Sequence, residues 1–173
     1  MQKVKVYIDG ANMFYTQKKI GWSFDWKKIK NQLENNKEVL EWRYYVGVKK
    51  DDDGMRKYLK YLNAIGLNTI TKPLKKIKVG TDDKRLNDNQ GNYIYKANFD
   101  VEMTTDILLD KAKIDEITIF SGDSDFQYLV RKLKDAGLKV TVYSSRKTIS
   151  WELKLEASQV IYFEGMKERV RRE

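Results

Sequence analysis

The chain has 173 residues, of which 41% are hydrophobic and one is a proline, and this composition is typical of a globular domain with a sizeable core. It contains no cysteine and no histidine, which excludes disulfides, the usual zinc sites, thiol nucleophiles and Ser-His-Asp chemistry. The formal charge of +9 favours polyanionic partners, although basic surfaces also occur without any partner. No signal-type segment and no membrane-spanning apolar stretch is visible, so we expect a cytoplasmic protein without a membrane partner.

Strand-like and helix-like segments alternate along the chain. The predicted strands cover residues 3–8, 39–48, 67–71, 116–120, 138–143 and 159–163. The predicted helices begin near residues 12 and 25, and further helices cover 55–65, 99–112, 126–136 and 149–156. This alternation predicts an α/β fold, a three-layer sandwich in which helices cover both faces of a mainly parallel central sheet.

Residues 73–98 interrupt the alternation. Segments 75–79 and 92–96 resemble the two arms of a hairpin around a polar, glycine-containing middle. We therefore expect one domain over residues 1–173, with a hairpin-like insertion at about 73–98 and a basic C-terminal tail.

Aspartates follow two of the predicted strands. Asp9 stands at the end of the first strand, and Asp123 and Asp125 follow the strand at 116–120. Because parallel strands deliver their carboxyl ends to one edge of a sheet, these carboxylates are predicted to meet there. Asp100 begins the helix at 99–112, and whether it reaches the same edge depends on the path of the insertion. Each aspartate, like Asn12, also suits a turn or a helix cap, so a capping role remains open for each of them.

Several carboxylates at one edge repel each other, and a bound cation is the simplest compensation. Oxygen ligands without histidine or cysteine favour Mg²⁺ or Mn²⁺, so the predicted metal ligands are Asp9, Asp100, Asp123 and Asp125. Such ions polarise phosphates and activate water without a histidine base. The predicted activity is therefore metal-dependent hydrolysis of a phosphate ester.

Three motifs in this order resemble the NYN domain family, and in particular its LabA-like branch, within the PIN-like nuclease superfamily. They are Tyr7-Ile8-Asp9-Gly10-Ala11-Asn12-Met13-Phe14, Lys96-Ala97-Asn98-Phe99-Asp100 with Asp106 following, and Ser121-Gly122-Asp123-Ser124-Asp125-Phe126. The resemblance spans nearly the whole chain. Family members often carry Ala-Asp near the last strand, where this chain has Ala157-Ser158, so no carboxylate is expected from that region.

The resemblance implies a PIN-like fold and a metal-dependent endoribonuclease. By motif position, Asp9, Asp100 and Asp123 would be the catalytic metal ligands. The supporting residues would be Asn12, Lys96, Asp106 and Asp125. Asp106 lies about 120° from Asp100 around an ideal helix, so the two share a site only if Asp100 precedes the regular helix.

Basic and aromatic residues in predicted loops and in the insertion suit an RNA partner, because lysines track phosphates and aromatic rings stack on bases. The candidates are Lys75, Lys76, Lys78, Tyr93, Tyr95, Arg146 and Lys147. Each of them, taken singly, also fits a solvated surface or a core position. A homodimer is left open as a further state of the chain.

Two other functions compete with the ribonuclease. A non-catalytic RNA-binding or assembly module could keep the same fold, and it would tolerate the loss of Asp123. A small-molecule phosphohydrolase or a Toprim-like domain could use the Asp-Ser-Asp sequence at 123–125. Toprim chemistry, however, expects a glutamate after the first strand, where this chain has Asp9, and haloacid-dehalogenase phosphatases expect Asp-x-Asp there.

Overall fold

The computed structural model describes residues 1–79, 93–110 and 113–173. A six-stranded sheet in the order β3-β2-β1-β6-β7-β8 forms its centre, and every neighbouring pair is parallel. The strands are β1 (Gln2–Asp9), β2 (Lys37–Val48), β3 (Asn68–Pro73), β6 (Glu116–Phe120), β7 (Lys139–Ser144) and β8 (Gln159–Tyr162). The sheet confirms the fold class predicted from the alternating segments.

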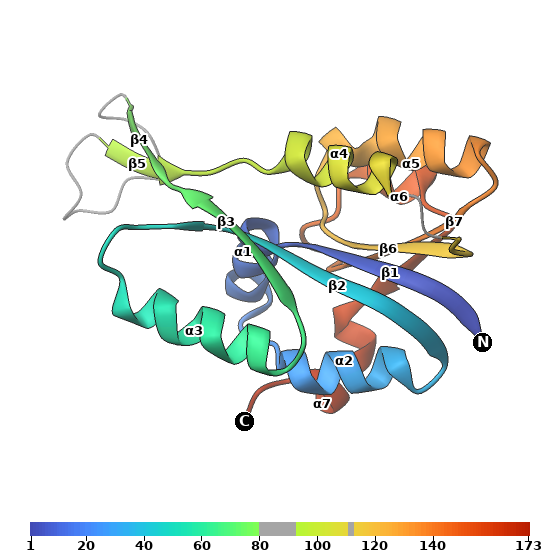
Figure 1. Cartoon of the computed structure of the whole chain (residues 1–173), viewed down its shortest axis with the longest axis horizontal. Helices are drawn as coiled ribbons and strands as arrows, with labels where there is room; N and C mark the ends of the chain where they lie inside the picture. The colour runs from blue at the N-terminus through green and yellow to red at the C-terminus, as the bar shows by residue number, and fades with distance from the viewer. Residues whose placement is uncertain (80–92, 111–112) are drawn as a thin grey trace.

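Helices cover both faces of the sheet, and Figure 1 shows α4 and α5 on one face and α2 and α3 on the other. The helices are α1 (Gly10–Ile20), α2 (Trp26–Glu34), α3 (Asp53–Ala64), α4 (Asp100–Leu109), α5 (Gln127–Asp135), α6 (Trp151–Glu156) and α7 (Lys167–Val170). Asp25, Asp52 and Ser150 cap α2, α3 and α6 by accepting a backbone N–H three residues ahead. The sequence analysis missed α7, because four residues are too few to show a helical period.

Two hydrophobic clusters separate the layers. One buries Val4, Val6 and Ile8 of β1 against α1, α2 and α3. The other packs α4, α5 and α6 against the opposite face of the sheet, where Tyr7 of β1 is fully buried. β1 is therefore covered on both faces, as expected for a central strand of a parallel sheet.

A separate ribbon projects from the body of the domain (Figure 1). Its strands β4 (Lys75–Lys78) and β5 (Tyr93–Lys96) pair antiparallel, with Lys76 opposite Tyr95 and Lys78 opposite Tyr93. The middle of the predicted insertion, residues 80–92, lies outside the described residues. In the described parts of the chain, every helix falls short of the length and apolar character that a membrane crossing requires.

Candidate functional site

Three carboxylates meet between β1 and β6, where the order in which the chain adds strands to the sheet reverses. β1 continues through β2 to β3 on one side, and β6 continues through β7 to β8 on the other, so the carboxyl ends of β1 and β6 flank a topological switch point. Asp9 ends β1, Asp123 follows β6, and Asp100 is the first residue of α4. One carboxylate oxygen from each lies within 4.8 Å of the other two. The structure thus brings together the three aspartates that the motifs single out, including Asp100, whose position the sequence left open.

Glycines allow the two loops that carry Asp9 and Asp123 to pack closely. A Cβ on Gly10 would lie 2.5 Å from the carbonyl oxygen of Tyr45 in β2. A Cβ on Gly122 would lie 2.3 Å from the carbonyl oxygen of Thr148. Both distances are shorter than any side chain tolerates, so each aspartate neighbours a position where only glycine fits.

Asn12 and Ser121 tie these loops together. The Asn12 backbone N–H donates to Asp9 Oδ1 at 3.1 Å, and its side-chain Oδ1 accepts the Gly122 N–H at 2.9 Å. The Ser121 hydroxyl donates to Asp9 Oδ2 at 3.2 Å, while its oxygen accepts the Asp123 N–H. Asn12, a supporting candidate by its motif position, therefore links the two loops, and Ser121 does the same. Sequence reasoning did not assign Ser121 a role, although a serine closing a buried strand needs a hydrogen-bond partner.

Burial and mutual repulsion make the cluster electrostatically unfavourable. The pKa of the Asp9 carboxyl is raised to about 6, mainly by burial and also by the charges of Asp100 and Asp123, while the hydrogen bonds from Asn12 and Ser121 oppose the rise. The pKa of Asp100 is also raised, mainly by burial and then by Asp123 and Asp125, while Lys96 opposes the rise. Among the described residues, none of the three clustered carboxylates forms an ion pair within 4.0 Å. Their oxygen-only donor set fits a hard divalent cation such as Mg²⁺ or Mn²⁺.

The remaining predicted site residues lie around this cluster. Asp125 is exposed and lies outside the group of three, and its backbone N–H donates to Asp123 Oδ1 at 3.0 Å. Lys96 ends β5 close enough to Asp100 to oppose the rise in its pKa. Asp106 points to other partners: its Oδ2 accepts the Tyr45 hydroxyl at 2.7 Å and lies 3.3 Å from the Arg43 guanidinium.

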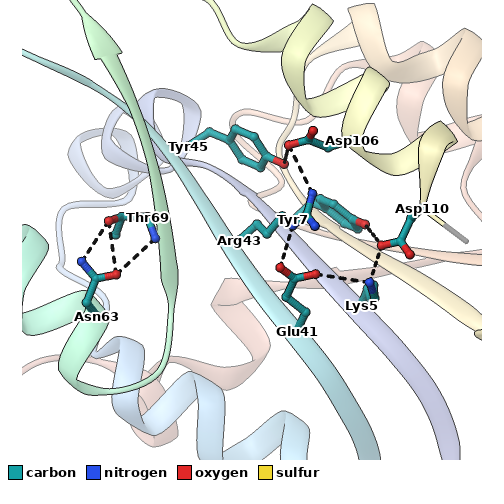
Figure 2. Close-up of polar contacts among 9 residues, drawn as sticks. All are labelled: Lys5, Tyr7, Glu41, Arg43, Tyr45, Asn63, Thr69, Asp106 and Asp110. Carbon is teal, nitrogen blue, oxygen red and sulfur yellow. Dashed lines mark hydrogen bonds and ion pairs between the residues drawn. The ribbon is translucent and has the colours of Figure 1, made fainter. Parts of the chain in front are cut away.

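Asp106 belongs to a polar network that joins α4 to β1 and β2 (Figure 2). Arg43 also binds Glu41 at 2.8 Å, and Lys5 pairs with both Glu41 and Asp110. The Tyr7 hydroxyl donates to Asp110 at 3.2 Å. The network therefore fixes α4, and with it Asp100, against the sheet.

The predicted RNA-binding residues fall into two groups. Lys75, Lys76, Lys78, Tyr93 and Tyr95 lie on the β4–β5 ribbon, where the Lys76 ammonium lies 4.1 Å from the centre of the Tyr93 ring. Arg146 and Lys147 follow the carboxyl end of β7, and the Arg146 guanidinium lies 4.2 Å from the centre of the Tyr162 ring. All seven are exposed, so their positions are compatible with contact to a nucleic acid.

Fold and site together define a parallel α/β domain with a carboxylate cluster at its topological switch point. The chain belongs to the NYN domain family, whose pattern it matches over residues 3–164, so the resemblance seen in the three motifs is confirmed. This family is part of the PIN-like nuclease superfamily.

Known relatives agree with this assignment. The chain is 32% identical over 154 residues to the low amplitude and bright protein LabA of Synechococcus elongatus, covering 88% of this chain and 78% of that protein. A crystal structure of a protein of unknown function from Vibrio parahaemolyticus superposes with a TM-score of 0.74 at 23% identity. The superposition covers 93% of this chain and 92% of that one, and it shows that the fold is shared.

Proposed function

We propose that the chain is a metal-dependent ribonuclease that hydrolyses RNA phosphodiester bonds at Asp9, Asp100 and Asp123. The observation that carries this proposal is the convergence of three carboxylates from separate chain segments, with oxygens within 4.8 Å of one another. None of the three forms an ion pair with another described residue. Membership of a nuclease-related family and a charge of +9 support it.

The residues of the site have separate tasks in this proposal. Asp9, Asp100 and Asp123 hold Mg²⁺ or Mn²⁺, and such an ion, when bound, polarises a phosphate and lowers the pKa of water. Asn12 and Ser121 keep the two strand-end loops in register, so that the carboxylates stay in place. Lys96, beside Asp100, supplies a positive charge that can contact the RNA phosphate.

The test is cleavage of labelled RNA, single-stranded and structured, with matched DNA. Wild type, Asp123→Asn and the control Asp135→Asn are each assayed with Mg²⁺, Mn²⁺ or EDTA. Asp135 lies on α5 with a side chain 63% exposed, so its amide variant makes the same chemical change away from the site. We expect cleavage of RNA by wild type and Asp135→Asn with metal, and none with EDTA or by Asp123→Asn.

Two results would overturn the proposal. Intact RNA under every condition, together with tight RNA binding, would identify a non-catalytic binding or assembly module. Equal cleavage by wild type and Asp123→Asn would show that the activity does not arise at this site.

A further inference from the structure

A cavity of about 820 Å³ adjoins the carboxylate cluster on the side of α1 and α3. It is lined by parts of α1, β2, α3 and β5, and Arg172 near the C-terminus also contributes. Gly10, next to Asp9, and Lys96, whose charge acts on Asp100, both belong to its wall. The cavity wall therefore includes residues that neighbour the cluster, and the cavity's size is in the range of about 300–1,000 Å³ that ligand pockets occupy.

The charge of this cavity suits an anion with apolar parts. Its described lining includes the cations Lys18, Lys96 and Arg172 and no aspartate or glutamate. The described wall of the cavity thus offers positive charge and apolar surface, and the three clustered carboxylates are not part of it. A chain of phosphates carrying bases has this complementary composition.

Aromatic rings at the cavity are exposed to solvent. Phe14 on α1 is 59% exposed and Tyr95 on β5 is 41% exposed, although both line the cavity. A lysine lies over each ring: the Lys18 ammonium is 4.5 Å from the centre of the Phe14 ring, and that of Lys49 is 3.9 Å from the centre of the Tyr95 ring. Exposed rings beside lysines are the arrangement by which proteins stack unpaired bases and hold their phosphates.

We propose that this cavity holds unpaired nucleotides of a single-stranded RNA, next to the phosphate that lies at Asp9, Asp100 and Asp123. Bases stack on Phe14 and Tyr95, and Lys18 and Arg172 contact the backbone. Bases in a duplex are stacked on each other and paired, so they cannot enter such a cavity, and the substrate is a single strand or an unpaired loop. That the bound nucleotides lie beside a phosphate to be cleaved rests on the proposed ribonuclease function, whereas the binding of RNA in the cavity does not.

α1 contains a matched pair of residues for the test. Phe14 and Tyr15 are neighbours, 59% and 51% exposed, and each has a lysine four residues ahead, Lys18 at 4.5 Å and Lys19 at 5.2 Å from the ring centre. Phe14 and Lys18 line the cavity, but Tyr15 and Lys19 do not. The two pairs lie on the same helix and have similar exposure and the same charge. A difference in RNA binding between their variants therefore reports on the cavity and not on the general surface.

The experiment measures fluorescence anisotropy of a labelled single-stranded RNA and of the matching duplex in EDTA, where no cleavage is expected. Phe14→Ala and Tyr95→Ala should each weaken single-strand binding about tenfold, as the loss of one stacked base predicts. Tyr15→Ala should stay within about twofold of wild type, and the duplex should bind more weakly than the single strand. Lys18→Gln and Lys19→Gln repeat the comparison without removing a ring.

Equal losses in the Phe14 and Tyr15 variants, or no loss in either, would overturn the cavity as the binding site. A loss confined to Tyr15→Ala and Lys19→Gln would also overturn it, because it places the RNA on the other flank of α1. Failure of the proposed ribonuclease is a separate result. If RNA binds through Phe14 but stays intact with metal, the binding site stands and the catalytic proposal is wrong.

If RNA is cleaved equally well by wild type, Phe14→Ala and Tyr95→Ala, the catalytic proposal stands and the binding site is wrong.

Discussion

Helix α4 carries aspartates toward both of its ends, and the two ends differ in how the protein compensates their charge. At the C-terminal end, Asp106 pairs with Arg43 and Asp110 with Lys5, and two tyrosine hydroxyls donate to them (Figure 2). At the N-terminal end, Asp100 joins two further carboxylates, and among the described residues none of these three carboxylates forms an ion pair, although Glu102 nearby pairs with Lys72. The carboxylates that are paired with cationic side chains hold α4 against the sheet. The carboxylates without such a partner favour the binding of a metal cation.

The largest effect is expected for Asp100→Asn, because it removes one negative ligand from the uncompensated end. Metal-ion catalysis contributes several kcal/mol to such reactions, so RNA cleavage should fall at least about 100-fold. The free energy of unfolding in EDTA should change little. Single-turnover cleavage and urea denaturation measure the two quantities, and cleavage near the wild-type rate would remove Asp100 from the site.

Asp110→Ala tests the compensated end. The Asp110 side chain is 8% exposed and that of its partner Lys5 is 12% exposed, so the variant leaves a partly buried ammonium and the Tyr7 hydroxyl short of a partner. We expect a loss of about 2 kcal/mol in the free energy of unfolding, measured by urea denaturation.

The matched control for this stability change is Asp135→Ala. Asp135 pairs with Lys132 at 3.8 Å, and the two side chains are 63% and 51% exposed. Its removal should cost no more than about 0.5 kcal/mol. Equal costs for the two variants would contradict the docking role of the network.

The smallest effect is a pH dependence at Asp9. Its pKa rises from 3.8 to about 6 on folding, so above pH 6 its charge destabilises the folded state. As the pH falls below 6, the folded protein takes up a proton that the unfolded chain binds only near pH 4, so this penalty shrinks and is gone below about pH 4. In EDTA, Asp9→Asn should therefore be more stable than wild type by about 1–2 kcal/mol at pH 8, and this advantage should shrink by pH 5.

Urea denaturation of both proteins at the two pH values measures this difference. Added Mn²⁺ at pH 8 should stabilise wild type more than Asp9→Asn, because binding to the folded state alone raises stability. If the difference in stability between wild type and Asp9→Asn does not depend on pH, the charge of Asp9 does not destabilise the folded state.

Much of the site followed from the sequence for a simple reason. Asp9 and Asp123 each end a strand, and a parallel sheet places such residues at one edge whatever the details of packing. Asp100 could not be placed in the same way, because it is preceded by the insertion and not by a strand of the main sheet. Its position depends on how α4 packs, which is a property of the whole domain.

The network under α4 could not be predicted from the strand pattern. Lys5 lies between Val4 and Val6 on β1, and such alternation is typical of a strand with one face in water. In the structure that polar face is covered by α4, and Lys5 is paired across the layers with Glu41 and Asp110. A local pattern cannot distinguish a solvated charge from one whose partner lies about a hundred residues further along the chain.

The pairing of β1 with β6 at the centre of the sheet determines when the site can form during synthesis of the chain. β1 is synthesised first, and its neighbour β6 only after β2, β3 and α4, so Asp9 and Asp100 both precede Asp123 out of the ribosome. The three carboxylates cannot assemble until β6 has joined the sheet. Under the proposed function, a nascent chain would therefore stay inactive until β6 and Asp123 have left the ribosome.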